Sequence, residues 1–401
     1  MGGRASHRLS PFVVLCGVGF LGRLSYEMAR TPLTPLYARH LGAPEQLIGL
    51  IVAAVTITGI VVKLPSGALS DLFGFRRVML AGALVKASGP FLYLAVLSWP
   101  QLLAGRFYHG LATALYAPPT SALVAKVYPK ERGNRLGLYS ASENAGVVLG
   151  PVIGGVVLAA ANFSIAFIVS GVIGILALLA MLRIPRDRHT TVAATGDRRK
   201  LGDALRGLVT GVREIISDPA IRLVSLVEGM LWMGIGSLQA YLPLYAASIH
   251  IAVWQIGLLA GGQGVASIVS RPFLGKRSDR LGRRPLIVGG AVLCIVTLIA
   301  IPYTGNFALL LGLSVIFGLG TGMVTPSTTA MIGDLVTAGN YGSAMGVFGS
   351  LWDTGHAAGP VIFGFLVVAL GYRTSWLLMA LVMVVALLIF LVGMRKRSVA
   401  A

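Results

Sequence analysis

The sequence predicts an all-α integral membrane protein whose twelve transmembrane helices form two pseudo-symmetric six-helix bundles. Three observations support this fold class. Of the 401 residues, 56% are hydrophobic and only 12% are charged, which is about half the charged share of a typical soluble protein. Apolar stretches of spanning length recur along the whole chain, and the second half repeats the residue pattern of the first. This composition excludes a soluble enzyme.

Each predicted helix is an apolar stretch of about 20 residues, the length that crosses the hydrocarbon core of a bilayer. The first stretch leads into Arg23, Glu27 and Arg30 without a small-residue cleavage pattern, so we expect it to stay in the membrane and not to be removed as a signal peptide. In chain order the predicted spans are 11–37, 47–69, 78–97, 101–125, 136–160, 164–184, 221–247, 253–274, 286–302, 307–331, 343–370 and 373–394.

The placement of the basic residues predicts how the chain is oriented. The formal net charge is +19, from 33 Lys and Arg against 14 Asp and Glu. Most of the basic residues fall in the two termini, in the central loop and after the second, fourth and eighth spans, all on one side of the predicted topology. The positive-inside rule therefore places both termini in the cytoplasm of a multi-pass protein of the inner (plasma) membrane. Since the surplus charge indicates topology, we expect the lipid bilayer as a partner and no nucleic acid.

The second half of the chain is a parallel duplicate of the first. A shift of 208 residues places the Pro-Leu-Tyr-Ala run at 35–38 on the same run at 243–246. An even number of spans returns the second copy to the same side of the membrane. We therefore predict an N-terminal bundle at 1–184, a charge-rich cytoplasmic linker at 185–220 and a C-terminal bundle at 221–401. Apolar positions near the end of the linker are compatible with an interfacial helix.

The loops after the second and eighth spans carry copies of one motif. The second copy reads Gly-x-x-x-Asp-Arg-x-Gly-Arg-Arg, and the first keeps part of this pattern with Leu72 and Phe75 at two usually basic positions. The motif and the duplication resemble the major facilitator superfamily of transporters, with substrate bound between the two halves. In that family the motif is a latch that steadies one access state; a solvated turn that only follows the positive-inside rule is the alternative. The residues expected to form it are Gly67, Asp71, Gly74, Arg76, Gly275, Asp279, Arg280, Gly282 and Arg283.

The fifth span matches the antiporter signature of the same superfamily at every fixed position. These positions are Gly137, Gly146, Gly150, Pro151, Gly154 and Gly155. Three of the glycines are four residues apart, so they form a smooth stripe that lets a neighbouring backbone approach closely. The resemblance implies that the stripe packs the fifth helix against the eighth, where Gly261, Gly262 and Gly264 offer small partners. Ordinary small-residue packing is the alternative.

Ionisable residues inside the spans are the candidates for proton coupling, because each costs free energy to insert. Arg23, Glu27 and Arg30 share one face of the first helix, which must then face a cavity. If the halves rock and break the pairing of Glu27 with an arginine, the affinity of its carboxylate for a proton changes. Asp353, near the middle of its span, is the second candidate. A structural ion pair is the alternative for Glu27, and for Lys63 and Arg30 we expect their charged ends to reach the membrane surface.

Arg106, followed by Gly110, resembles the fourth-helix arginine of proton-coupled families and is the third coupling candidate. Together with Lys86 and Arg23, it gives the interior of the first half more positive than negative charge. This surplus favours an anionic or zwitterionic substrate. The residues predicted to line the substrate cavity are Arg23, Tyr26, Lys86, His109, Glu143, Trp232, Tyr241 and His356.

The sequence thus predicts a secondary transporter and not an enzyme, exporting a drug or other small organic molecule in exchange for protons. It resembles the drug:proton antiporter branch of the superfamily. Cys16 and Cys294 lie apart in apolar spans and indicate neither a disulfide nor a metal site. We expect no cofactor, a proton gradient as the energy source and a monomer. An uptake symporter or uniporter for an organic anion or other metabolite is the first alternative, and a transport-inactive membrane receptor is the second.

Overall fold

The computed structural model describes residues 10–184, 213, 218–336 and 341–400, and its secondary structure there consists of helices and turns. The long helices are α1 (Pro11–Arg30), α2 (Leu33–His40), α3 (Glu45–Phe73), α4 (Phe75–Leu92), α5 (Trp99–Val127), α6 (Arg132–Ala160), α7 (Phe163–Leu182), α9 (Pro219–Ser248), α10 (Val253–Leu281), α11 (Arg283–Ala300), α12 (Phe307–Leu335) and α13 (Tyr341–Ala400). Short 3₁₀ turns follow α4 at Tyr93–Ala95 and α11 at Ile301–Tyr303. Most of the predicted linker lies outside the described residues.

Every predicted span is helical over most of its length, so the all-helical fold is confirmed. Ten segments of the described chain are long and apolar enough to cross a membrane. One of them, Ala344–Arg395, contains the last two predicted spans, which meet at the non-helical Gly371. The predicted span at 101–125 lies within α5.

The first predicted span is not continuous, which differs from the expectation of one helix over 11–37. α1 ends at Arg30, Thr31 is extended, and α2 begins after Pro32. The cause is local, because proline lacks the amide donor that a helix needs and pushes the preceding residue out of the helical region. The break makes Arg30 the last residue of α1.

The internal repeat is visible in the helices themselves. α3 and its counterpart α10 are both 29 residues long, and α4 and α11 are both 18 residues long. Gly74, with φ 86°, joins α3 to α4, and Gly282, with φ 88°, joins α10 to α11, both in the left-handed region. Only glycine adopts this backbone without strain. The motif glycines therefore make the tight turns that the sequence predicts.

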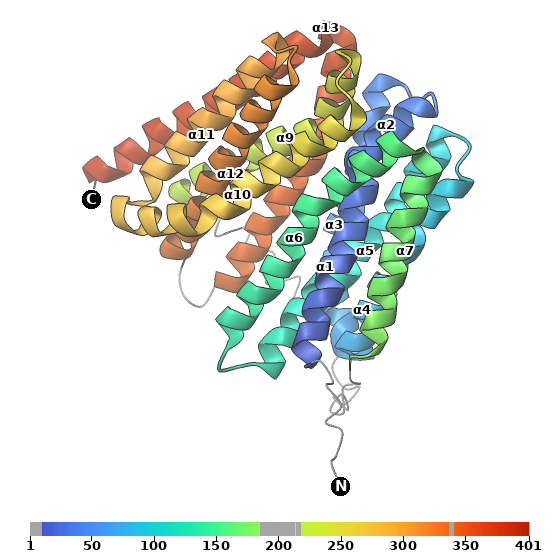
Figure 1. The fold of residues 1–401 in the computed structure, drawn as a ribbon. Coiled ribbons are helices and arrows are strands. Elements are labelled where there is room, and N and C mark those ends of the chain that lie inside the picture. Colours follow the sequence, from blue (N-terminus) through green and yellow to red (C-terminus); the bar gives the residue numbers. More distant parts are fainter. Residues whose placement is uncertain (1–9, 185–212, 214–217, 337–340, 401) are drawn as a thin grey trace.

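The two halves meet at one end and diverge toward the other. Figure 1 shows α1 to α7 in one bundle and α9 to α13 in a second, with the start of α1 and the end of α13 at the diverging end. The closed end comprises α2, the start of α3 and the bend at Gly371. The open end comprises the turns at Gly74 and Gly282.

Candidate functional site

A cavity of about 410 Å³ lies between the two halves. Its wall is formed by α1, α3, α5 and α6 from one half and by α9, α10, α12 and α13 from the other. These are four pairs of helices related by the internal repeat. The volume falls in the range of small-molecule sites, roughly 300 to 1,000 Å³. The pseudo-symmetry thus places one compartment at the interface of the repeats.

Three charged side chains of α1 form part of the cavity wall. Glu27 Oε1 lies 2.8 Å from Arg23 Nη2 and 3.7 Å from Arg30 Nη1. The glutamate is only 5% exposed, although it lines the cavity together with both arginines. The predicted common face of α1 therefore does point into the cavity. Placing a carboxylate between two guanidinium groups compensates for the cost of burying it.

His356 on α13 links this cluster to the other half. Its Nε2 lies 3.0 Å from Arg30 Nη2 and 2.9 Å from the amide oxygen Oε1 of Gln239 on α9. Its Nδ1 lies 3.1 Å from the hydroxyl of Thr56 on α3. Nε2 therefore lies between a donor, the Arg30 guanidinium, and an acceptor, the Gln239 amide oxygen. The charge on α1 is thus tied to α13 across the interface.

Lys63 and Asp353 form a second link across the halves. The Lys63 ammonium on α3 pairs with the Asp353 carboxylate on α13. The expectation that Lys63 reaches the membrane surface is therefore wrong, and so is the same expectation for Arg30. In both cases the partner comes from the other end of the chain, so no local pattern could reveal it.

Comparison with known proteins agrees with this geometry. A family model described as Major Facilitator Superfamily matches residues 15–254 and 224–400. The chain belongs to this superfamily. It is therefore a multi-pass membrane transporter and not an enzyme, and superfamily members generally need no cofactor. Within the described residues, no group of three or more His, Cys, Asp or Glu could hold a metal ion.

Two relatives match most of the chain. An uncharacterised MFS-type transporter from Methanocaldococcus jannaschii is 25% identical, over 92% of each chain. The quinolone resistance protein NorA from Staphylococcus aureus is 23% identical over 88% of this chain and 87% of that protein.

Two solved structures share the fold at low sequence identity. A bacterial homologue of the human lysosomal transporter Spinster, in an inward-facing and unoccupied conformation, has a TM-score of 0.82 at 15% identity, covering 98% of both chains. The nucleoside transporter NupG has a TM-score of 0.79 at 14% identity, covering 96% of this chain and 100% of that one.

Three of the basic residues predicted for this transporter's interior lie away from the cavity. Arg106 is fully buried and donates to the carbonyls of Ile51 at 3.4 Å and Val52 at 3.5 Å, which holds α5 against α3. His109 contacts the Tyr93 hydroxyl through Nδ1 at 2.9 Å. The Lys86 ammonium stacks over the ring of Tyr116, 4.1 Å from its centroid. Lys86 and His109 are thus not among the residues that line this cavity, and helix packing supplies their partners.

The remaining candidates are divided. Tyr26, Trp232 and His356 line the cavity, whereas Tyr241 lies at the closed interface between the halves. On α6 the wall is formed by Asn144 and not by the adjacent Glu143. Sequence reasoning missed Gln239 and Arg271, which also line the cavity. The only signal for Arg271 was its place in a predicted span, one residue before a proline.

The glycine stripe of α6 packs against α1, which corrects the expectation that it packs against the eighth span. A Cβ added at Gly146 would lie 2.8 Å from the Leu24 amide nitrogen, and one at Gly150 would lie 2.7 Å from the Cβ of Glu27. A Cβ at Gly154 would lie 2.9 Å from the carbonyl oxygen of Met28. The stripe is therefore filled by the neighbouring helix of its own half.

Contact between α6 and α10 does occur, on an adjacent face of α6. A Cβ added at Gly155 would lie 3.0 Å from the Cα of Gly257, and one at Gly257 would lie 2.5 Å from the carbonyl oxygen of Pro151. Gly137 has open space around it. The signature thus serves two helix contacts, one inside the half and one between the halves.

The two loop motifs form different local contacts. In the second copy Arg283 pairs with Asp279 and lies 3.2 Å from Asp334 on α12. In the first copy Arg76 donates to the Ile184 carbonyl at 2.9 Å and to the Leu182 carbonyl at 3.0 Å, at the end of α7. Gly67 and Asp71 lie outside the residues whose side chains are described. The expected latch function stays a prediction.

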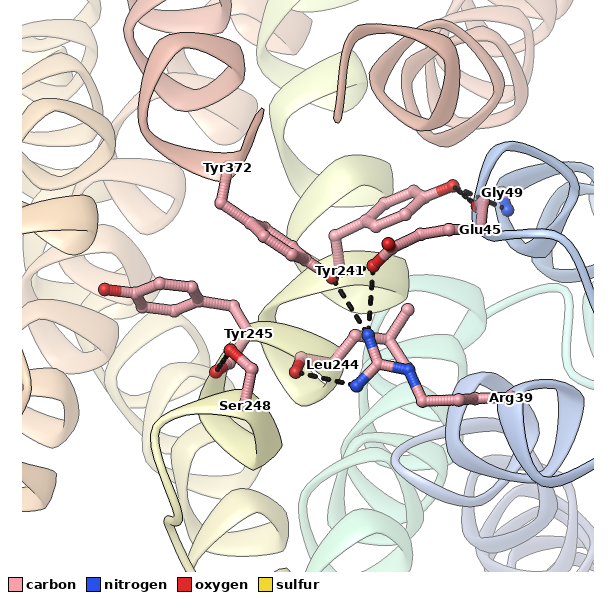
Figure 2. A network of polar contacts seen from close by, with 8 residues as sticks. All are labelled: Arg39, Glu45, Gly49, Tyr241, Leu244, Tyr245, Ser248 and Tyr372. Atoms are coloured by element: carbon pink, nitrogen blue, oxygen red, sulfur yellow. Dashed lines mark hydrogen bonds and ion pairs between the residues drawn. The ribbon is translucent and has the colours of Figure 1, made fainter. Parts of the chain in front are cut away.

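A polar network that sequence reasoning missed joins the halves at the closed end (Figure 2). Arg39 of α2 donates to the Leu244 carbonyl at 3.3 Å and to the Tyr372 hydroxyl at 3.1 Å, and it lies 3.0 Å from Glu45 Oε1. The Tyr372 hydroxyl also bonds to the Glu45 carboxylate, and the Tyr241 hydroxyl donates to the Glu45 carbonyl at 2.9 Å. These bonds must break before the closed end can open.

Proposed function

We propose that the protein exports a small organic molecule in exchange for protons, with Glu27 as the proton-binding group. The observation that carries this proposal is the position of Glu27 at the cavity wall between Arg23 and Arg30, with Arg30 bonded to His356 of the other half. Movement of one half against the other would break the bond between Arg30 and His356 and so move the Arg30 guanidinium relative to Glu27. The charge next to Glu27 then differs between the two access states, and so does the affinity of its carboxylate for a proton.

The distribution of basic residues supports the orientation that this cycle requires. Arg76 and Arg77 follow the turn at Gly74, and Lys276, Arg277 and Arg280 precede the turn at Gly282, all at the open end. The positive-inside rule then places the open end and both termini in the cytoplasm. In this orientation the structure is the inward-facing state of an alternating-access cycle, in the inner membrane.

The direction of transport is supported by likeness to NorA, whose name states quinolone resistance. In the proposed cycle, substrate enters from the cytoplasm while Glu27 is ionised and paired. Closure of the open end carries it to the outer face, where the substrate leaves and a proton binds Glu27. Return to the inward-facing state delivers the proton to the cytoplasm.

Everted membrane vesicles with an acidic interior test the proposal. We expect saturable uptake of the quinolone norfloxacin that stops when the pH gradient is collapsed. Glu27→Gln should lower this uptake at least about tenfold, because the amide cannot exchange a proton. Glu131→Gln, which changes a carboxylate paired with Arg135 outside the cavity, should leave the uptake unchanged. Gradient-independent uptake, or full activity of Glu27→Gln, would contradict the mechanism.

The same assay separates export from the uptake alternative. If acidic everted vesicles take up no drug while whole cells accumulate a metabolite, the protein is an uptake system and the export proposal is wrong.

A further inference from the structure

The wall of the central cavity carries more positive than negative charge. Its ionic side chains are Arg23, Arg30, Lys63, Arg271, Glu27 and Asp353. Both carboxylates already have partners: Glu27 pairs with the two arginines of α1, and Asp353 pairs with Lys63. Among the described residues no carboxylate lies within 4 Å of Arg271. Its guanidinium therefore makes no direct ion pair with a described residue, and its nearest acidic neighbour, Glu228, acts on it only through space.

Arg271 lies among hydroxyl groups. Its Nη2 donates to Ser267 Oγ over a long 3.4 Å, and the same oxygen accepts from the Thr321 hydroxyl at 3.2 Å. Thr325 of α12 lines the same part of the wall. A guanidinium has five donors in a planar fork that matches a carboxylate or sulfonate. Most of the donors of Arg271 are therefore free for a ligand, and neighbouring hydroxyls can supply further bonds.

The nearby buried acid does not satisfy this arginine. Glu228 of α9 is fully buried, and its two oxygens accept hydrogen bonds from the indole of Trp232 at 2.9 Å and from the hydroxyl of Thr328 at 2.8 Å. It forms no ion pair with Arg271 within 4 Å. The acid is thus held by its own neighbours, and the arginine faces the cavity.

Arg271 is also reachable from the open end. A second cavity, of about 570 Å³, is lined by Arg271 and Thr325 together with Thr329 and Asp334 of α12. Asp334 lies near the turn at Gly282, where it contacts Arg283. The two cavities share Arg271 and Thr325, so a molecule that enters along α12 meets this guanidinium before it reaches the α1 cluster.

The wall also provides an aromatic surface. Trp232 lines the cavity and stacks on Trp352, with ring centroids 5.6 Å apart and planes 10° from parallel. Ile235 and Ile268 add apolar surface. We infer that the transported molecule is an organic anion with an aromatic body, whose carboxylate or sulfonate binds Arg271 while the body packs against Trp232. This inference names the substrate class of the proposed function and rests on the same cavity.

Equilibrium binding of two matched probes tests the inference without a proton gradient. Naphthalene-1-sulfonate and naphthalene-1-sulfonamide share one aromatic body and differ in charge. We expect purified wild-type protein to bind the radiolabelled sulfonate at least about tenfold more tightly, because a charge-assisted bidentate bond adds to the shared apolar contact. Equal binding of both probes, or tighter binding of the sulfonamide, would overturn the inference on the wild-type protein alone.

Variants then locate the site. Arg271→Gln should remove the preference for the sulfonate, Arg271→Lys should keep part of it, and Arg277→Gln on the same helix should keep all of it. Melting temperatures show that each variant is folded. A preference that survives in folded Arg271→Gln would place the anion elsewhere and contradict the inference.

The binding result and the transport result are independent. If norfloxacin exchanges with protons but the sulfonate preference is missing, the proposed function stands and the substrate class is wrong. If the preference depends on Arg271 but no proton exchange occurs, the anion site stands and the exporter mechanism is wrong.

Discussion

Removing one hydroxyl group at the closed end should open that end more often. Tyr372→Phe keeps the ring and deletes the oxygen that bonds to Glu45 and accepts a hydrogen bond from Arg39. Both partners belong to the other half, so the substitution weakens the interface without creating a cavity. It acts only on the state in which the halves touch at this end.

The structure sets the magnitude of this effect. Hydrogen bonds to charged groups contribute about 1.5 to 3 kcal/mol each in protected sites. The Arg39 and Glu45 side chains are 39% and 35% exposed, so water can replace part of the lost hydrogen bonding. The expected loss of free energy is therefore smaller than in a buried site. We expect a loss of about 1 to 2 kcal/mol from the closed state, which corresponds to a shift of about 5- to 30-fold in the ratio of open to closed molecules.

Pulsed electron paramagnetic resonance measures this ratio directly. Cys16 and Cys294 are first replaced by alanine so that only introduced cysteines are labelled. The spin labels are then attached at Leu97 and Gly305, which lie in exposed loops of opposite halves at the closed end. The long-distance population should rise in Tyr372→Phe.

Tyr245→Phe is the matched control, because this tyrosine bonds to the Thr304 carbonyl within its own half. An unchanged distance distribution in Tyr372→Phe, or an equal change in the control, would refute the reasoning.

Two further predictions concern contacts that organise the cavity. Gly150→Ala should lower the melting temperature and impair substrate-induced proton release, because the new methyl would lie 2.7 Å from the Glu27 Cβ and 2.9 Å from the α1 backbone, a conflict of about 1 to 3 kcal/mol. Gly137→Ala faces open space and should be neutral; equal effects at both glycines would argue against the packing explanation. A double-mutant cycle on Lys63 and Asp353 should give a coupling of about 0.5 to 1 kcal/mol in thermal unfolding, since both ends are partly exposed. The charge-reversed pair Lys63→Asp with Asp353→Lys should recover most of the loss, and no recovery would mean that the pair is incidental.

The fold could be read from the sequence because its determinants are local or periodic. Apolar length defines each span, and the duplication defines the pairing of the halves. The turn glycines at 74 and 282 were recognisable because left-handed backbone strongly favours that residue. The common face of Arg23, Glu27 and Arg30 followed from helix geometry alone. Each of these inferences needs information from within one helix or from the repeat.

The site was predicted less well because its contacts join distant segments. Lys63 pairs with a residue 290 positions away, and Arg30 bonds to one 326 positions away. Arg106 was predicted as a coupling residue and Lys86 as a cavity residue because a buried charge suggests function, yet backbone carbonyls contact Arg106 and an aromatic ring contacts Lys86. A single sequence shows that a charge is inside the membrane, but its partners depend on helix rotation.

The charged face of the first helix and the glycine stripe, which the sequence analysis treated separately, form one contact in the structure. The charged face of α1 and the glycine stripe of α6 meet where Gly150 approaches Glu27, and Gly154 approaches the next residue of α1. Because the stripe has no side chains, α1 lies close enough to α6 to hold the carboxylate at the cavity wall between its arginines. On the opposite side of this contact, Gly155 and Pro151 touch α10 at Gly257. A movement of α10 during transport would therefore press on the same helix that positions Glu27. The signature thus connects the interface between the halves to Glu27, the residue that we propose as the proton-binding group.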